Sequence, residues 1–285
     1  MNNSIAEKNK ASWNAGAARY AQRAHAEQRI RKIIENPACA FHRTTWGLIQ
    51  RYLPDLRGKR VCVPSSGDNL AVFAFASLGA SVTSCDISEN QLANAERVAQ
   101  QYGLDKRIDF VCADTMALDG VADAAYDFVY TSNGVHVWIN DLPAMYQSVH
   151  RILKPGGLYI LYEIHPMQRP IDYDEKRLDG KLTVTKPYDQ TGPFDDGYET
   201  TFHWRMMDIL NAMLASGLAI GRMEEMFAEK DYDEPFWVAN AFGQCEALSS
   251  REEIDALHDW RHNPVAALPN WFCVVARKEM EHNER

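Results

Sequence analysis

The chain has 285 residues, of which 46% are hydrophobic, enough to bury the core of one large or two small domains. Its formal net charge of −9, with no basic run, argues against a protein that binds nucleic acid by neutralising phosphates. The N-terminal residues lack the apolar segment of a signal peptide, and no stretch has the ~20 apolar residues of a membrane span. We therefore expect a cytoplasmic protein without a membrane partner.

Six cysteines are spread along the chain as single residues, with no C-x-x-C pair and no histidine at zinc spacing. Cys62, Cys85 and Cys112 fall inside expected strands, where a small thiol packs well against covering helices. We therefore expect reduced structural cysteines and no metal site.

The N-terminal part predicts two helices, one over residues 4–35 that ends at Asn36-Pro37 and one over 39–53 that ends before Pro54. Five short apolar runs then predict strands, and the segments between most of them carry helical spacing. The expected strands are 60–64, 81–85, 108–113, 127–132 and 158–164, and the expected helices are 69–78, 89–102 and 141–153. Strands that alternate with helices indicate βαβ units and a parallel sheet.

After the fifth strand the pattern changes, because residues 166–203 hold prolines, glycines, charges and aromatic residues with little periodicity. An irregular segment of this length is usually a lid or a substrate-binding insertion. A helix over 204–216, a strand over 218–224, a second irregular insertion over 228–269 and a closing strand over 270–277 follow. The expected organisation is a helical cap over 1–55, a main domain over 56–278 and a disordered tail over 279–285.

The turn after the first strand reads Pro64-Ser65-Ser66-Gly67, and the second strand ends at Asp86, 19 positions beyond the glycine. This β-turn-α-β layout is typical of proteins that bind an adenosine-bearing cofactor. A dinucleotide site needs three glycines in the turn, so a single glycine indicates a nucleoside without a pyrophosphate. Asp86 is the expected ribose ligand, and its alternative role is to cap the next helix, for which Ser88 is better placed.

Three motifs in this order resemble the class I S-adenosylmethionine-dependent methyltransferases: the turn with Asp86, then Ala113-Asp114-Thr115, then Leu153-Lys154-Pro155-Gly156-Gly157. Residues 203–214 are also similar to a helix of the small-molecule branch that includes quinone-biosynthesis enzymes. The resemblance implies an α/β fold: a Rossmann-like, seven-stranded, mostly parallel sheet with helices on both faces, an antiparallel last strand and an N-terminal helical extension.

The resemblance also implies S-adenosylmethionine as cofactor and a set of residues around it. The expected cofactor-binding residues are Pro64, Ser65, Ser66, Gly67, Asp86, Ile87, Gln91, Asp114, Thr115, Ser132 and Asn133. Asp114 is expected to accept from the adenine amino group, with Thr115 beside it, and its alternative is an ordinary turn aspartate. The family's strand carboxylate and Gly-x-Gly-x-Gly are missing. Backbone carbonyls or Asp68 would then hold the cofactor's amino group in place of the lost carboxylate.

Methyl transfer needs positioning and, for hydroxyl, amine or acidic carbon acceptors, a general base. Glu163 and His165 face the same side of the fifth strand at its carboxyl end, where a carboxylate can hold a histidine tautomer. A histidine held by local backbone is the alternative. Tyr20 shares a helix face with Trp13 and would approach the sulfonium, unless the pair is a plain apolar stripe.

The expected acceptor-binding residues follow the fourth strand or lie around the first insertion: His136, Trp138, Tyr198 and His203. Further insertion aromatics would either line the acceptor pocket or pack a lid, namely Tyr173, Tyr188, Phe194, Phe236 and Trp237. Residues 132–138 lack the Asp/Asn-Pro-Pro-aromatic motif in which methyltransferases acting on nucleic-acid bases resemble one another. Together with the negative charge, this argues against a nucleic-acid acceptor.

The sequence thus predicts transfer of a methyl group from S-adenosylmethionine to a small, partly apolar metabolite. Two alternatives stay open: a non-catalytic protein that binds the cofactor or senses a metabolite, and an NAD-dependent oxidoreductase, which the lost glycines disfavour. An extended first helix also leaves open a homo-oligomer that packs through it.

Overall fold

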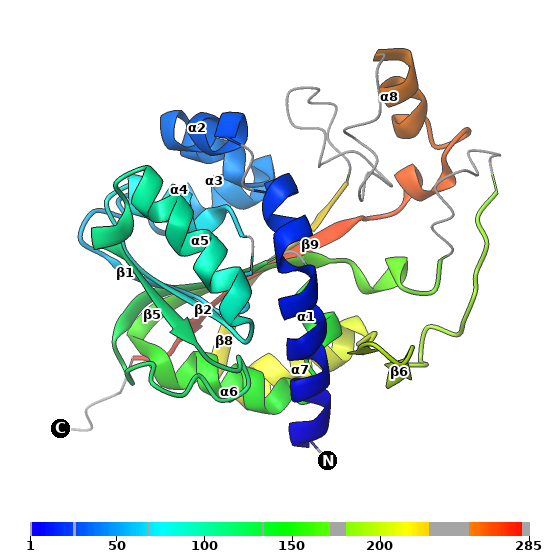
Figure 1. Ribbon diagram of the computed structural model, residues 1–285. Helices are drawn as coiled ribbons and strands as arrows, with labels where there is room; N and C mark the ends of the chain where they lie inside the picture. The colour runs from blue at the N-terminus through cyan, green and yellow to red at the C-terminus, as the bar shows by residue number, and fades with distance from the viewer. Residues whose placement is uncertain are drawn as a thin grey trace.

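A seven-stranded sheet forms the centre of the computed structural model, which describes residues 2–24, 27–67, 69–132, 134–171, 181–227 and 251–280 (Figure 1). Its strands lie in the order β3-β2-β1-β4-β5-β9-β8. Their bounds are β1 (Arg60–Val63), β2 (Ser81–Asp86), β3 (Ile108–Cys112), β4 (Tyr126–Ser132), β5 (Leu153–Ile164), β8 (Leu218–Met226) and β9 (Trp271–Lys278). The first five strands are parallel, and β9 runs antiparallel to both β5 and β8, which confirms the predicted α/β fold.

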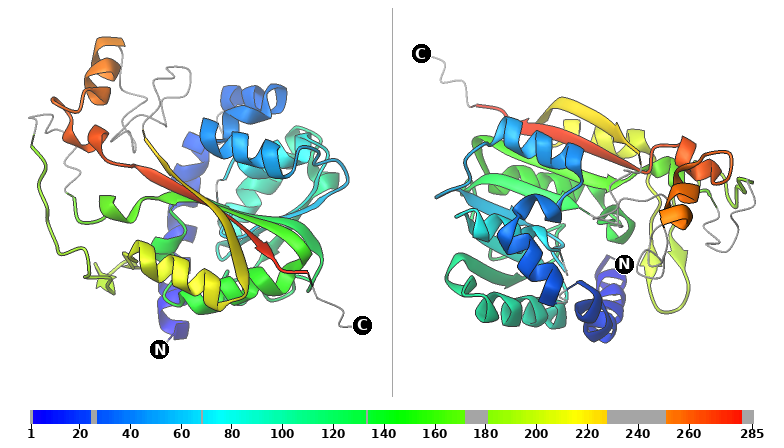
Figure 2. Two further views of the ribbon diagram at one scale, coloured as in Figure 1. Left: turned by 180° about the vertical axis from the view of Figure 1, so that it is seen from behind. Right: turned by 90° about the horizontal axis from the view of Figure 1, so that it is seen from above.

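Helices cover both faces of this sheet, as the two views in Figure 2 show. One face carries α2 (Glu27–Glu35), α3 (Arg43–Tyr52), α4 (Ala71–Ser77) and α5 (Glu89–Gln101). The other face carries α6 (Leu142–Ile152) and α7 (Met206–Ala215). The first helix, α1 (Asn2–Ala24), lies instead beside α5 and across the carboxyl ends of the strands.

Alternate side chains along each strand divide the buried residues into two clusters, one on each face. On β4, Phe128 and Tyr130 pack under α4, whereas Val129 packs against the α6 side. Cys62 and Cys85 belong to the second cluster and are fully buried free thiols, as expected from their strand positions. Because the strands are buried on both faces, they read as continuous apolar runs in the sequence.

Several boundaries differ from the prediction. In place of one helix over 4–35 the chain forms α1 and α2, because α2 buries Ile30 and Ile33 against the sheet while α1 covers its carboxyl edge. The helix over 39–53 is a short turn, η1 (Pro37–Ala40), followed by α3, whose first turn is capped by the His42 side chain. The fifth strand starts at Leu153, the last residue of the expected 141–153 helix, instead of at residue 158.

Regular structure also lies inside the two expected insertions. The first holds η4 (Pro166–Gln168) and a hairpin of β6 (Phe194–Asp195) and β7 (Thr200–Thr201). The described part of the second holds α8 (Arg251–His258) and η7 (Pro264–Ala267). The remaining short turns are η2 (Asp105–Arg107) and η3 (His136–Trp138). Residues 281–285 of the expected 279–285 tail lie outside the described residues. Within the described residues, no helix is long and apolar enough to cross a membrane.

Phe75 on α4 provides a test of the core, since its fully buried ring packs against Phe41, Phe128 and Tyr130 at 5.2–5.5 Å between ring centroids. We expect Phe75→Ala to lower the free energy of unfolding by about 3–5 kcal/mol, because it removes buried area and leaves a cavity. Phe227→Ala, at a ring that is 48% exposed, should change it by less than about 0.5 kcal/mol. Urea unfolding followed by circular dichroism measures both, and equal losses would contradict the assigned core.

Candidate functional site

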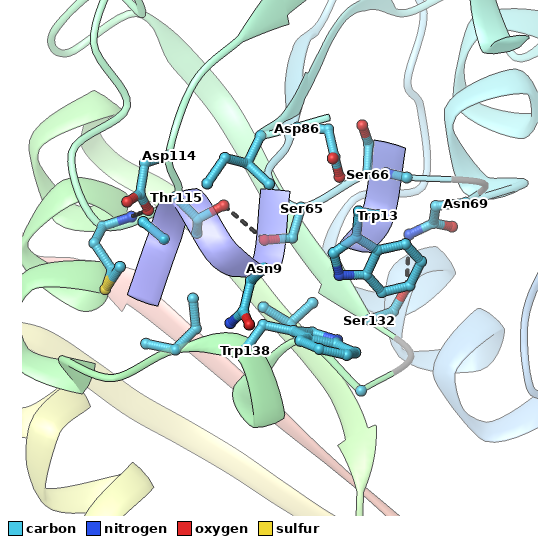
Figure 3. A pocket seen from close by; sticks show the side chains of 17 residues that line it. Asn9, Trp13, Ser65, Ser66, Asn69, Asp86, Asp114, Thr115, Ser132 and Trp138 are labelled. Atoms are coloured by element: carbon cyan, nitrogen blue, oxygen red, sulfur yellow. Dashed lines mark hydrogen bonds between the residues drawn. The ribbon is translucent and has the colours of Figure 1, made fainter. Parts of the chain in front are cut away.

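A pocket opens where β1, β2, β3 and β4 end, at the point where the strand order reverses between β1 and β4. Open α/β sheets bind their ligands at this switch point. The pocket is lined by Ala6, Asn9, Trp13, Ser65, Ser66, Gly67, Asn69, Asp86, Ile87, Asp114, Thr115, Met116, Ser132, Gly134, Val135, Trp138 and Ile139. Figure 3 shows Asp114 and Thr115 at one end and Ser66 and Asn69 at the other.

The turn after β1 is held by side chains from neighbouring loops. Ser65 has a φ of +47°, a left-handed conformation that costs free energy for a residue with a side chain. Its hydroxyl lies 2.7 Å from that of Thr115, which ties this turn to the one after β3. Ser66 is buried, and its hydroxyl accepts a 2.8 Å hydrogen bond from Ser84 on β2. Hydrogen bonds between polar side chains thus hold this turn in place. In dinucleotide sites the corresponding turn is formed by glycines.

Asp86 links the two turns that frame the pocket. One carboxylate oxygen accepts from the backbone N–H of Gly67 at 2.7 Å, and the other accepts from that of Ser88 at 2.8 Å. Ser88 itself caps α5, because its hydroxyl accepts from the N–H of Gln91, so the cap lies where the sequence favoured it. The Asp86 side chain lines the pocket at 8% exposure.

Asp114 stands at the opposite end of the pocket. Its carboxylate accepts from the backbone N–H of Met116 at 2.9 Å, and burial raises its pKa above the ordinary value. Thr115 beside it is buried, and Met116 and Ile87 supply apolar surface to the same pocket. This end therefore combines a carboxylate acceptor with an apolar slot, which suits a flat heterocycle with an amino group.

The α1 helix forms the roof of the pocket through Ala6, Asn9 and Trp13. The Trp13 ring packs edge-on against Trp138, with ring centroids 5.0 Å apart. Trp13 also contacts Tyr20 at 4.9 Å, so the expected aromatic pair exists. Trp13 reaches the pocket, whereas Tyr20, one of the expected catalytic residues, is not among the described residues that line it.

Glu163 lies behind the wall formed by residues 134–139. It is 1% exposed and accepts from the backbone N–H groups of His136, Ile164 and Gly134. Burial raises its pKa, against the opposing effects of Arg169, 4.0 Å away, and of these N–H donors. The carboxylate thereby fixes the backbone of the segment that carries Gly134 into the pocket wall.

The side chain of His136 extends this buried group away from the pocket. Its Nε2 lies 2.6 Å from the Tyr146 hydroxyl and its Nδ1 lies 3.5 Å from Glu163. Burial lowers the pKa of His136 to about 3, so the ring is neutral at pH 7. The sequence predicts Glu163 as the general base and His136 as a residue that binds the methyl acceptor. In the structure the two residues contact each other.

His165 takes a partner other than the expected Glu163. Its Nδ1 accepts from the backbone N–H of Met167 at 3.1 Å, and its Nε2 faces Glu225 at 3.3 Å. Alternate strand residues share a face only while the strand continues, and β5 ends at Ile164. Burial lowers the pKa of His165, with Glu225 opposing that shift.

Other expected residues lie away from the pocket. Pro64 is buried beneath the turn, and Gln91 is fully buried with no hydrogen-bond partner for its side-chain amide among the described residues. Tyr198 is 82% exposed on the β6–β7 hairpin, and His203 packs on Phe194 at 4.6 Å. The expectations for Asp68, Asn133, Tyr173, Phe236 and Trp237 lie outside the described residues.

The sequence analysis missed two asparagines of the pocket. Asn69 donates to the Ser132 hydroxyl at 2.8 Å and accepts from the N–H of Ala71. Its position just before a helix is a capping signal that could have identified it. Asn9 bonds to Thr200, 191 residues away, and no local pattern marks such a pair.

Comparisons with known proteins show what the chain is similar to. Residues 64–161 match the family model of a methyltransferase domain. The chain is 27% identical over 208 residues to a sterol 24-C-methyltransferase of Gibberella zeae, across 70% of this chain and 50% of that protein. It is 38% identical over 81 residues to a malonyl-[acyl-carrier protein] O-methyltransferase of Pseudescherichia vulneris, across 28% of each. The chain therefore spans half or less of the length of these curated relatives.

A solved structure supports the same assignment. The S-adenosylmethionine-dependent methyltransferase from Mesorhizobium loti is 25% identical and superposes with a TM-score of 0.57, across 81% of this chain and 96% of that one. The family match begins at Pro64 and includes Asp86 and Asp114, and the β9 insertion next to β5 is the antiparallel strand that the resemblance implied. The chain is therefore similar to the S-adenosylmethionine-dependent methyltransferases, in residues 64–161 and in the fold of its sheet.

Proposed function

We propose that this protein transfers the methyl group of S-adenosylmethionine to a small, partly apolar molecule. The observation that carries the proposal is the pocket at the switch point, with Asp86 above its centre and Asp114 at one end. Two carboxylates fit the hydroxyl and amino donors of a nucleoside, and a single-glycine turn fits a ligand without a pyrophosphate. The chemical groups that line the pocket therefore suit S-adenosylmethionine.

Different residues of the pocket would bind different parts of S-adenosylmethionine. Asp86 would accept from the ribose hydroxyls, and Asp114 from the adenine amino group. Ile87 and Met116 would contact the ring, while Ser132 and the 65–67 turn would hold the amino-acid part. When bound, S-adenosylmethionine supplies an electrophilic methyl group. The chain contributes position, exclusion of water by the α1 roof, and a group that takes a proton.

Glu163 is the better-supported candidate for the proton acceptor. Its carboxylate lies directly behind Gly134, whereas the Nδ1 of His165 is already occupied by the N–H of Met167. The relatives named above act on sterols and on malonyl-acyl-carrier protein, so a small molecule with apolar character is the acceptor class we propose. The quinone-type acceptor, the cytoplasmic location, the domain limits and an oligomer through α1 stay predictions.

Two measurements test the function itself. Titration calorimetry should show binding of S-adenosylmethionine and S-adenosylhomocysteine, and absence of binding would refute the proposal at its first step. A labelled-methyl assay against a metabolite extract, with the product identified by mass spectrometry, should then reveal the acceptor. Binding without methylation of any acceptor would favour the sensing alternative, and binding of NADH would favour an oxidoreductase.

Asp86 provides a direct test of the cofactor site. We expect Asp86→Ala to weaken binding of S-adenosylhomocysteine about tenfold or more, because loss of a charged hydrogen bond costs about 1.5–3 kcal/mol. Asp109→Ala, at an exposed carboxylate on the neighbouring β3, is the matched control and should bind normally. Calorimetry measures both affinities. An unchanged affinity in Asp86→Ala would remove Asp86 from the ribose role.

Glu163 gives the reaction a pH dependence with a defined sign. A base must be deprotonated, so kcat should fall as the pH drops through the pKa of Glu163, which burial places above its usual range. Glu163→Gln should lower kcat about a hundredfold or more and abolish this acidic limb. The labelled-methyl assay across pH, with the acceptor it identifies, measures the limb.

The same profile separates Glu163 from its alternatives. A lower rate with the limb intact would assign Glu163 to holding the 134–136 backbone. Glu225→Gln is the control for His165, because Glu225 opposes the lowering of the pKa of that histidine. A limb that moves to lower pH in Glu225→Gln would make His165 the base.

A further inference from the structure

The α1 helix is fastened at two sides of the pocket by polar contacts. On one side Lys8 forms an ion pair with Asp195, and the Ser12 hydroxyl donates to Glu199 at 3.1 Å, both in the β6–β7 hairpin. On the other side Lys10 pairs with Glu89 at the start of α5. Among the α1 side chains that the structure describes, only Asn9 and Ala17 are buried. The two ion pairs are partly exposed, and pairs of this kind contribute little to stability.

Asn9 is the buried member of these contacts. Its side-chain NH₂ donates to the carbonyl of Thr200 at 2.9 Å, and its side-chain oxygen accepts from the N–H of the same residue at 2.8 Å. Asn9 is 4% exposed and Thr200 3%, so neither backbone group of Thr200 has water as a substitute. The amide thereby acts as an added strand partner for β7, while its other side lines the cofactor pocket.

The chain just after β7 is also joined to the opposite wall of the pocket. The N–H of Phe202 donates to the carbonyl of Val137 at 2.8 Å, and the indole N–H of Trp204 donates to the carbonyl of Ile139 at 2.8 Å. Residues 200–204 therefore lie between α1 and the 137–139 segment. The β6–β7 hairpin is thus bonded to the roof through Asn9, while the residues after it are bonded to the 137–139 wall.

We propose that Asn9 is a positioning residue that couples closure of α1 over the cofactor to ordering of the β6–β7 hairpin on the acceptor side. A ligand that contacts Trp13 and Asn9 stabilises α1 in its position over the pocket. In that position the Asn9 side-chain amide forms both hydrogen bonds to the backbone of Thr200. Coupling of this kind is reciprocal, so the acceptor side is assembled when the cofactor is bound. The inference rests on the proposed function, since it requires the cofactor to occupy this pocket.

Hydrogen exchange of the full chain, read by mass spectrometry with and without S-adenosylhomocysteine, tests the coupling. In the wild type, the ligand should slow exchange in the 65–67 turn, in α1 and in residues 194–203. We expect the effect in 194–203 to be about fivefold or more, the lower end of coupling between sites. In Asn9→Ala, the ligand should still protect the 65–67 turn, but the added protection of 194–203 should disappear.

Two further variants separate the hydrogen bonds from other effects. Asn9→Asp keeps the size of the side chain but removes the donor to Thr200, so it should lose the coupling as Asn9→Ala does. Ser12→Ala removes a contact to the same hairpin from the same helix and should retain the coupling. Unchanged exchange of β1, β4 and β5 in each variant shows that the sheet is folded.

The outcomes distinguish this inference from the function on which it rests. Absence of ligand binding to the wild type would overturn both. Binding that protects the 65–67 turn without slowing exchange in 194–203 would overturn the coupling alone. Ligand-dependent protection of 194–203 that persists in Asn9→Ala and Asn9→Asp would also overturn it.

Discussion

The site depends on one carboxylate, that of Asp86, which is bonded to the backbone on both sides. Gly67 and Ser88 belong to turns that follow different strands, and each donates its N–H to a different oxygen of this side chain. Charge-assisted bonds of this kind are the stronger ones in proteins, and here they fix the separation of the two turns. The separation of the two turns is therefore set by a group that also lines the pocket.

Around that carboxylate, buried polar groups bond to the backbone of the loops that form the pocket. Glu163 accepts from the backbone N–H groups of Gly134 and His136 in the wall and from that of Ile164 beside it. Asn9 in the roof bonds to both backbone groups of Thr200. Each such group is costly to leave unpaired, so each specifies a single arrangement of its loop. These side-chain hydrogen bonds fix the backbone of the pocket loops, as ladder hydrogen bonds fix the backbone of strands.

The sheet could be predicted from the sequence because strands and helices are local patterns, and the carboxyl ends of the strands place Asp86 and Asp114 at one edge. The partners of Glu163 and His165 could not be predicted from the sequence, because they depend on where β5 ends and on which loop folds over that end. The role of Asn9 depends on a contact across 191 residues. Local periodicity carries no information about such contacts.

The place of β9 in the sheet has a consequence for how this protein is made. Strand β5 ends at Ile164, yet its free edge is covered only by β9, which begins at Trp271. During synthesis on the ribosome, the pocket-forming strands therefore emerge long before that edge is paired. The nascent chain presents an apolar strand edge for the time needed to translate more than a third of the protein. An unpaired edge of this kind invites association between chains, so we expect chaperone contact during translation.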